Sequence, residues 1–156
     1  MKIRLLAVGR KMPRWVADGF AEYARRMPRE SPLELIEIPP AKRPAGEDAP
    51  AARAAEAEQI RRRLGRDEHL IALDERGQAI DTRRLADWYG DWLMGGRDVA
   101  LVVGGADGLD PELLAAAGQR WSLSPLTLPH GLVRVIVAEQ LYRAWSLRSG
   151  HPYHRA

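Results

Sequence analysis

Short apolar runs that alternate with segments of helical spacing constrain the fold of this chain more than any other feature. The run VALVV at 99–103 is continuously apolar, which is typical of an interior strand in a parallel sheet. Similar runs at 2–8, 33–38 and 69–73 predict three further strands. Because helical patterns separate these runs, we expect an α/β domain with a mostly parallel sheet flanked by helices.

The expected helices are bounded by residues that commonly start or stop a helix, namely proline, glycine and an Asp or Thr cap. They are predicted at 13–27, 51–64, 82–94 and 111–117. The sequence ERGQAI at 75–80 is interpreted as a connection, and PPAKRPAGEDAP at 39–50 as a polar, proline-rich loop.

A last helix, expected at 132–149, is apolar nearly all round. Such a helix has to be covered on more than one side. In a short chain the sheet can cover one side and a second copy the other, so we expect a homodimer whose interface buries Trp145 or neighbouring aliphatic residues. Burial wholly within its own domain is the alternative.

Length and composition narrow the classes of protein further. The 156 residues fit a single domain, 1–156, and the absence of cysteine excludes disulfides, thiolate metal sites and cysteine nucleophiles. No apolar run approaches the roughly 20 residues that span a bilayer, and no signal-peptide pattern is present. We therefore expect a cytoplasmic protein that does not enter a membrane.

Charge is distributed unevenly along the chain. Residues 113–156 carry a net charge of +4, whereas the rest carries −1. A basic C-terminal third suits a polyanionic partner such as RNA, although ordinary surface solubility explains the same charge.

Two segments are candidates for ligand binding. In LVVGGADGLDPE a buried strand runs into Gly104 and Gly105 and then a helix, and strand ends of this kind bind ligands in open α/β sheets. The segment WSLSPLTLPH at 121–130 is too apolar for a surface loop, and adenine could satisfy its irregular backbone. A plain tight turn and a well-packed core loop are the respective alternatives.

The tail HPYHRA at 151–156, together with Glu139 and Arg143, is the third candidate. Arginine, histidine and tyrosine suit phosphate contact and base stacking. Glu139 and Arg143 also fit a simple surface ion pair on one helix face. Two histidines on a tail make a poor metal site, so no metal is expected.

Taken together, the motifs resemble the family of 23S ribosomal RNA pseudouridine N3-methyltransferases (RlmH), members of the SPOUT class. The resemblance runs through MKIRLLAVGRKMPRWV, ELIEIP, GRDVALVVGGADGL, SLSPLTLPHGLVRVIVAEQLYRAWS and HPYHR. It implies a SPOUT-type α/β fold with a C-terminal trefoil knot, a feature that general topology rules would not suggest. It also implies methylation of N3 of pseudouridine 1915 in 23S ribosomal RNA, on the assembled ribosome, with S-adenosyl-L-methionine as methyl donor.

The resemblance further assigns residues to roles. It implies cofactor binding by Leu73, Gly104, Gly105, Leu123, Ser124, Pro125, Leu126, Thr127 and Leu128. It implies catalytic or RNA-facing roles for His130, Glu139, Arg143, Tyr153, His154 and Arg155.

Several alternatives stay open at this point. The base that takes the proton from N3 is His154, His130 or Glu139. A SPOUT enzyme acting on transfer RNA and a non-catalytic ribosome-binding protein of the same fold are the rival functions. Because the tail follows the helix assigned to the dimer interface, we expect it to complete the neighbouring subunit's active site.

Overall fold

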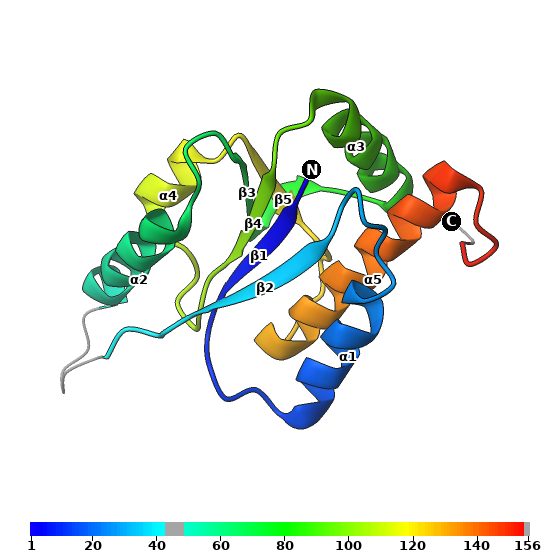
Figure 1. Ribbon diagram of the computed structural model, residues 1–156. Coiled ribbons are helices and arrows are strands. Elements are labelled where there is room, and N and C mark those ends of the chain that lie inside the picture. The colour runs from blue at the N-terminus through cyan, green and yellow to red at the C-terminus, as the bar shows by residue number, and fades with distance from the viewer. Residues whose placement is uncertain (43–48, 155–156) are drawn as a thin grey trace.

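The computed structural model describes residues 1–42 and 49–154. In this part of the chain five strands form a parallel sheet of order β2-β1-β4-β3-β5 (Figure 1). The strands are β1 Ile3–Val8, β2 Leu33–Ile38, β3 His69–Ala79, β4 Val99–Val103 and β5 Gln119–Ser122. The helices are α1 Arg14–Ala24, α2 Ala49–Arg63, α3 Thr82–Gly95, α4 Pro111–Ala116 and α5 His130–Ser149. The expected α/β architecture with a parallel sheet is confirmed.

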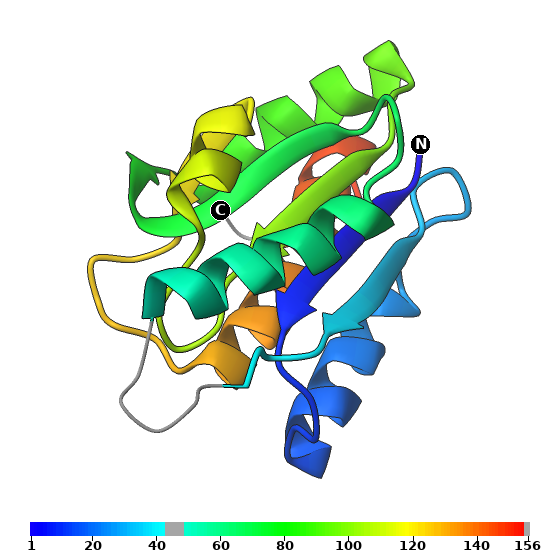
Figure 2. The same ribbon diagram turned by 90° about the vertical axis from the view of Figure 1, so that its left-hand side faces the viewer.

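Helices cover both faces of the sheet, with α1, α3 and α5 on one side and α2 and α4 on the other (Figures 1 and 2). Side chains along a strand alternate between the two faces. In β1, Ile3 and Leu5 face the core under α1, α3 and α5, whereas Leu6 and Val8 face the core under α2 and α4. Burial on both faces explains why the interior strands are continuously apolar.

Caps place most helix ends where the sequence predicts them. The Asp81 carboxylate accepts a hydrogen bond from Arg84 N at 2.8 Å, and Asp110 accepts from the first backbone amides of α4. Gly96 ends α3 in the left-handed region, with φ of 72°. The first helix is shorter than expected because 25–27 form a turn before Pro28.

Two interpretations of the third and fifth strands were wrong. The segment 75–79, expected as a connection, continues β3, and 121–122, expected as irregular, belong to β5. After a register shift, Gln78 pairs with Trp121. The strands approach closely at Gly77, where an added Cβ would lie 2.7 Å from the Arg120 carbonyl carbon. This long-range pairing overrides the polar local sequence.

The last helix, α5, packs on the sheet between α1 and α3 and begins at His130, two residues earlier than expected (Figure 1). Its own residues Ala138, Leu141 and Ala144 are buried in the core between the helix and the sheet. Leu132 and Ile136 are half-buried and belong to neither core.

Of the loop expected at 39–50, residues 43–48 lie outside the described residues, and 49–50 already belong to α2. Among the helices that the structure describes, none combines the length and apolarity needed to cross a membrane.

Candidate active site

A cavity of about 370 Å³ opens beyond the carboxyl end of β4 and beside the middle of β3, just past the point where the pairing of these two strands ends at Leu73 and Val103. Open α/β sheets bind their ligands at this edge. The structure brings together here the two segments singled out as candidate ligand sites, the glycine turn after β4 and residues 121–128. Of the expected cofactor-binding residues, Pro125 is exposed and does not line the cavity, whereas the others do: Leu73, Gly104, Gly105, Leu123, Ser124, Leu126, Thr127 and Leu128.

The glycine turn after β4 is shaped by contacts within its own backbone. Gly108 N donates to Gly105 O at 3.0 Å, and Gly108 has a φ of +78°. A Cβ added at Gly104 would lie 2.5 Å from the carbonyl carbon and oxygen of Gly108. Gly104 is therefore required by the turn itself, in agreement with the tight turn that the sequence left open as an alternative.

Residues 123–128 cross the cavity without regular structure, and a side chain satisfies part of their backbone. Ser124 Oγ accepts from Leu126 N at 2.9 Å. Within the described part of the chain, the backbone N–H groups of Thr127 and Leu128 have no hydrogen-bond partner. Free backbone donors beside the apolar Leu123 suit a flat heterocycle that carries acceptor atoms.

Two carboxylates that sequence reasoning missed also line the cavity. Asp74 and Glu75 follow Leu73 directly, near the middle of β3. Carboxylates accept hydrogen bonds from hydroxyl groups and pair with ammonium groups. Their position after a buried apolar run was the available signal, but interpreting 75–80 as a connection concealed it.

His130, at the start of α5, also lines the cavity and contacts a buried arginine. Arg134 is 1% exposed, and its Nη1 lies 2.8 Å from Glu37 Oε2. Its Nη2 donates to Gly9 O at 3.1 Å and faces His130 Nε2 at 3.4 Å. Burial and the neighbouring Arg134 charge lower the pKa of His130, so its ring is neutral at neutral pH.

The other expected catalytic residues form a separate cluster where the tail folds back on α5. Glu139 accepts hydrogen bonds from Arg143 Nη2 at 2.7 Å and from Tyr153 Oη at 2.9 Å. The Arg143 guanidinium lies 5.1 Å from the centre of the Tyr153 ring. His154 Nδ1 lies 3.0 Å from Ser146 Oγ. Arg155 lies outside the described residues.

The electrostatics of this tail cluster keep the phenol of Tyr153 protonated. Burial and the hydrogen bond to Glu139 raise the pKa of Tyr153 well above its ordinary value. Tyr153 is therefore a hydrogen-bond donor, while Glu139 remains the acceptor between Tyr153 and Arg143.

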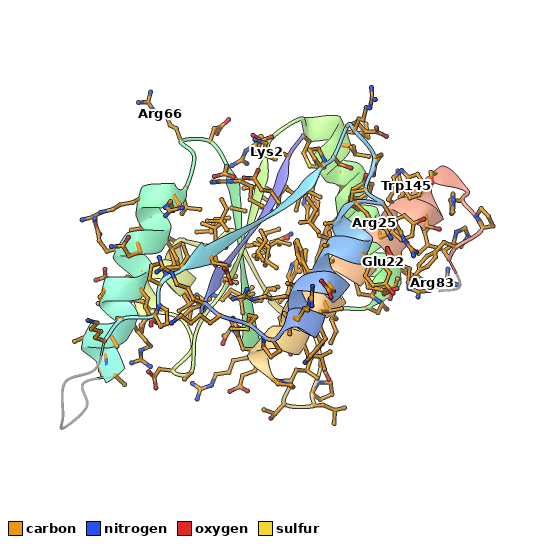
Figure 3. All side chains as sticks on the ribbon, turned by 60° about the horizontal axis from the view of Figure 1, so that its bottom comes forward. Lys2, Glu22, Arg25, Arg66, Arg83 and Trp145 are labelled. Atoms are coloured by element: carbon orange, nitrogen blue, oxygen red, sulfur yellow. The ribbon has the colours of Figure 1, made fainter. Side chains whose placement is uncertain are left out.

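Within one chain His130 and the arginine of the tail cluster lie at different positions along α5. His130 and Arg143 are separated by 13 residues of α5, or about 20 Å at the helical rise per residue. Figure 3 shows Trp145 at the tail end of α5, on the side where Glu22 and Arg25 of α1 also lie. Trp145 is half-buried and stacks on Tyr142 of its own chain.

A basic loop at 10–15, near the start of α5, was not predicted from the sequence. Arg10, Lys11, Arg14 and Trp15 are exposed in the segment between β1 and the first turn of α1, and Trp15 is 57% exposed. This segment adjoins the start of α5, because a Cβ added at Gly131 would lie 2.9 Å from Val16 Cγ2. The clustering of three cations around one exposed indole was the missed signal.

The described residues, 1–42 and 49–154, contain no evident metal site. No group of three or more His, Cys, Asp or Glu side chains in these ranges is arranged to hold a metal ion.

Comparison with known proteins identifies the family that this chain resembles. Residues 1–154 match the family model described as "Predicted SPOUT methyltransferase". The chain is 56% identical over 156 residues to ribosomal RNA large subunit methyltransferase H of Alkalilimnicola ehrlichii, covering 100% of both chains. It is 53% identical over 155 residues to the protein of that name from Hahella chejuensis, covering 99% of both.

Solved structures share the fold. A methylase family protein of Haemophilus influenzae matches with a TM-score of 0.56 and 16% identity, over 99% of this chain and 70% of that one. One from Neisseria gonorrhoeae matches with a TM-score of 0.54 and 15% identity, over 90% and 81%. From the family match and the full-length relatives together, the chain belongs to the SPOUT methyltransferase family, in the branch of the ribosomal RNA large subunit methyltransferases H.

Proposed function

We propose that the protein methylates N3 of a pseudouridine in 23S ribosomal RNA, with S-adenosylmethionine as methyl donor. The observation that carries the proposal is the 56% identity over the whole chain to a ribosomal RNA large subunit methyltransferase H. The choice of N3 and of pseudouridine rests on the resemblance of the sequence motifs. A ribosomal RNA substrate implies a cytoplasmic enzyme.

The cavity fits S-adenosylmethionine by the chemistry of its lining. The free N–H groups of Thr127 and Leu128, in a wall that also carries apolar side chains, suit the acceptor atoms of adenine. Asp74 and Glu75 suit the ribose hydroxyls or the ammonium group of the methionine part. When bound, the cofactor supplies a methyl group activated by its sulfonium sulfur.

The tail cluster supplies the remaining chemistry. The imide N3 of the base has to lose a proton, and Glu139 and His154 are the acceptors within this cluster. Tyr153 stays protonated, so it orients the base or Glu139 and does not take the proton. The Arg143 guanidinium offsets negative charge on the phosphate or the developing imide anion.

A homodimer with composite active sites brings the two halves together. Leu132, Ile136, Glu139 and Arg143 share one face of α5 by their spacing. Leu132 and Ile136 are half-buried and lie near the cavity end, while the tail covers the other end. If this face packs against its copy in the opposite direction, each tail meets the partner's cavity.

The RNA surface then extends beyond the tail. The exposed Arg10, Lys11 and Arg14 suit phosphate contacts, and Trp15 suits base stacking. This loop flanks the cavity mouth through its packing on the start of α5.

The direct test is methyl transfer from isotopically labelled S-adenosylmethionine. Whole ribosomes, free large subunits, isolated 23S RNA and transfer RNA are compared as substrates, and the modified nucleoside is identified by mass spectrometry. We expect N3-methylpseudouridine in ribosomes or large subunits. Transfer of methyl to transfer RNA alone, or ribosome binding without any transfer, would establish one of the two rival functions instead.

A further inference from the structure

His130 is connected to the far edge of the sheet by a continuous set of hydrogen bonds. Glu37, at the end of β2, holds the guanidinium of Arg134 at 2.8 Å, and that guanidinium faces His130 Nε2 at 3.4 Å. His130 itself lines the cavity, beside the glycine turn after β4. Residues from β2 and α5 are thus coupled to a side chain of the cavity wall.

The donors and acceptors of this set fix the proton on the imidazole. A guanidinium can only donate, so His130 Nε2 must accept from Arg134. In a neutral imidazole the other nitrogen, Nδ1, then carries the proton. The lowered pKa of His130 agrees with a neutral ring.

Arg134 is buried too deeply to serve as an RNA contact. It is 1% exposed, whereas its partner Glu37 is 41% exposed on its side chain. A buried charge is retained only where its partners are fixed, and here they are Glu37 and the carbonyl of Gly9. The side chain therefore holds neighbouring groups in place.

We propose that Arg134 is a positioning residue, which locks the Nδ1–H tautomer of His130 and holds its ring in place as part of the cofactor-binding cavity wall. The lone pair of Nε2 is directed at Arg134, so His130 is not the base that deprotonates the substrate. This leaves Glu139 and His154 of the tail cluster. The role of the cavity rests on the proposed function, whereas the tautomer does not.

Nuclear magnetic resonance of the ring nitrogens tests the tautomer in the full chain without any ligand. In ¹⁵N-labelled protein, with His130 assigned through the His130→Asn variant, we expect a neutral ring protonated at Nδ1. In Arg134→Met the Nε2–H form should become populated. A wild-type ring protonated at Nε2, or at both nitrogens at neutral pH, would overturn the proposal even if the variants failed to fold.

Calorimetry with S-adenosylmethionine tests the effect on the cavity. Arg134→Met should weaken binding by roughly ten- to hundred-fold, the range lost with a charge-assisted hydrogen bond. Arg134→Lys, which keeps a charge and a donor, should restore part of the affinity. Ile60→Ala, in the core on the other face of the sheet, controls for loss of stability alone. Equal weakening in Ile60→Ala and Arg134→Met would contradict a positioning role.

Steady-state kinetics separates a positioning role from a base. His130→Asn keeps a donor near Nδ1, so kcat at saturating cofactor should stay within about ten-fold while the cofactor KM rises. Loss of kcat with an unchanged cofactor affinity would identify His130 as the base. If the wild-type chain binds no S-adenosylmethionine at all, the proposed function fails, and the tautomer measurement still decides the hydrogen-bond assignment.

Discussion

Replacing Gly104 with alanine perturbs the turn after β4 by a single methyl group. The added Cβ would lie 2.5 Å from the carbonyl carbon and oxygen of Gly108, and 2.9 Å from Leu109 N. All three are backbone atoms, so no flexible side chain can move aside. The turn has to open, and its hydrogen bond from Gly108 N to Gly105 O is lost.

The magnitude follows from these two effects. The lost hydrogen bond costs about 1 kcal/mol and the overpacking about 1–3 kcal/mol of unfolding free energy. A loss of about 2–4 kcal/mol lowers the melting temperature of a chain of this size by about 5–15 °C. Because Gly104, Gly105 and Gly108 all line the cavity, we expect S-adenosylmethionine to bind at least about ten-fold more weakly.

The chain contains a matched control for this substitution. Gly95, at the end of α3, has no atom within 4 Å of an added Cβ and no positive φ. Gly95→Ala should stabilise the helix by about 0.5–1 kcal/mol and leave cofactor affinity unchanged. Differential scanning calorimetry and isothermal titration of both variants provide the measurements. A Gly104→Ala protein with wild-type stability and affinity would refute the role assigned to the turn.

Three further expectations concern the dimer, the RNA surface and pH. Ile136→Glu should convert the dimer to a folded monomer, because a charge would enter the proposed interface; sedimentation with circular dichroism checks this, and a persisting dimer contradicts it. Trp15→Ala should weaken RNA binding by about 1–3 kcal/mol in fluorescence anisotropy with cofactor affinity unchanged, and unaltered RNA binding would exclude the loop. Burial lowers the pKa of His130 and His69 below 6.5, so the unfolded chain binds more protons below that pH. The free energy of unfolding should therefore fall as pH drops through about 6.5, with a shallower slope in the His69→Asn, His130→Asn double variant, and urea titrations that show no such fall would contradict the shifts.

Much of the fold follows from local patterns in the sequence. The buried strand 99–103 is apolar on both faces, and the caps Asp81 and Asp110 sit at the starts of their helices. These signals depend only on neighbours in the chain, so sequence reasoning identifies them. The continuation of β3 through 75–79 depends instead on pairing with β5, some 40 residues later, and its polar local sequence gives little sign of it.

The candidate site likewise combines features that the sequence predicts with features that depend on long-range contacts. Apart from Pro125, the residues that the resemblance assigns to cofactor binding line one cavity, while the structure separates His130 from Glu139 and Arg143 along α5. The role of Arg134 could not be predicted because its partner Glu37 lies 97 residues away and the surrounding helix is apolar. The trefoil knot remains a prediction of the resemblance.

Mixing two impaired proteins at limiting S-adenosylmethionine tests most directly whether the cavity of one chain works with the tail of another. One protein lacks residues 151–156, and the other carries Gly104→Ala. Each alone should methylate ribosomes poorly, since one has no tail and the other a distorted cavity. In purified heterodimers, the intact cavity of the tail-less chain meets the intact tail of its partner, so we expect about half of wild-type activity from one working site. Verified heterodimers without recovered activity would show that each tail serves its own subunit and would contradict the composite site.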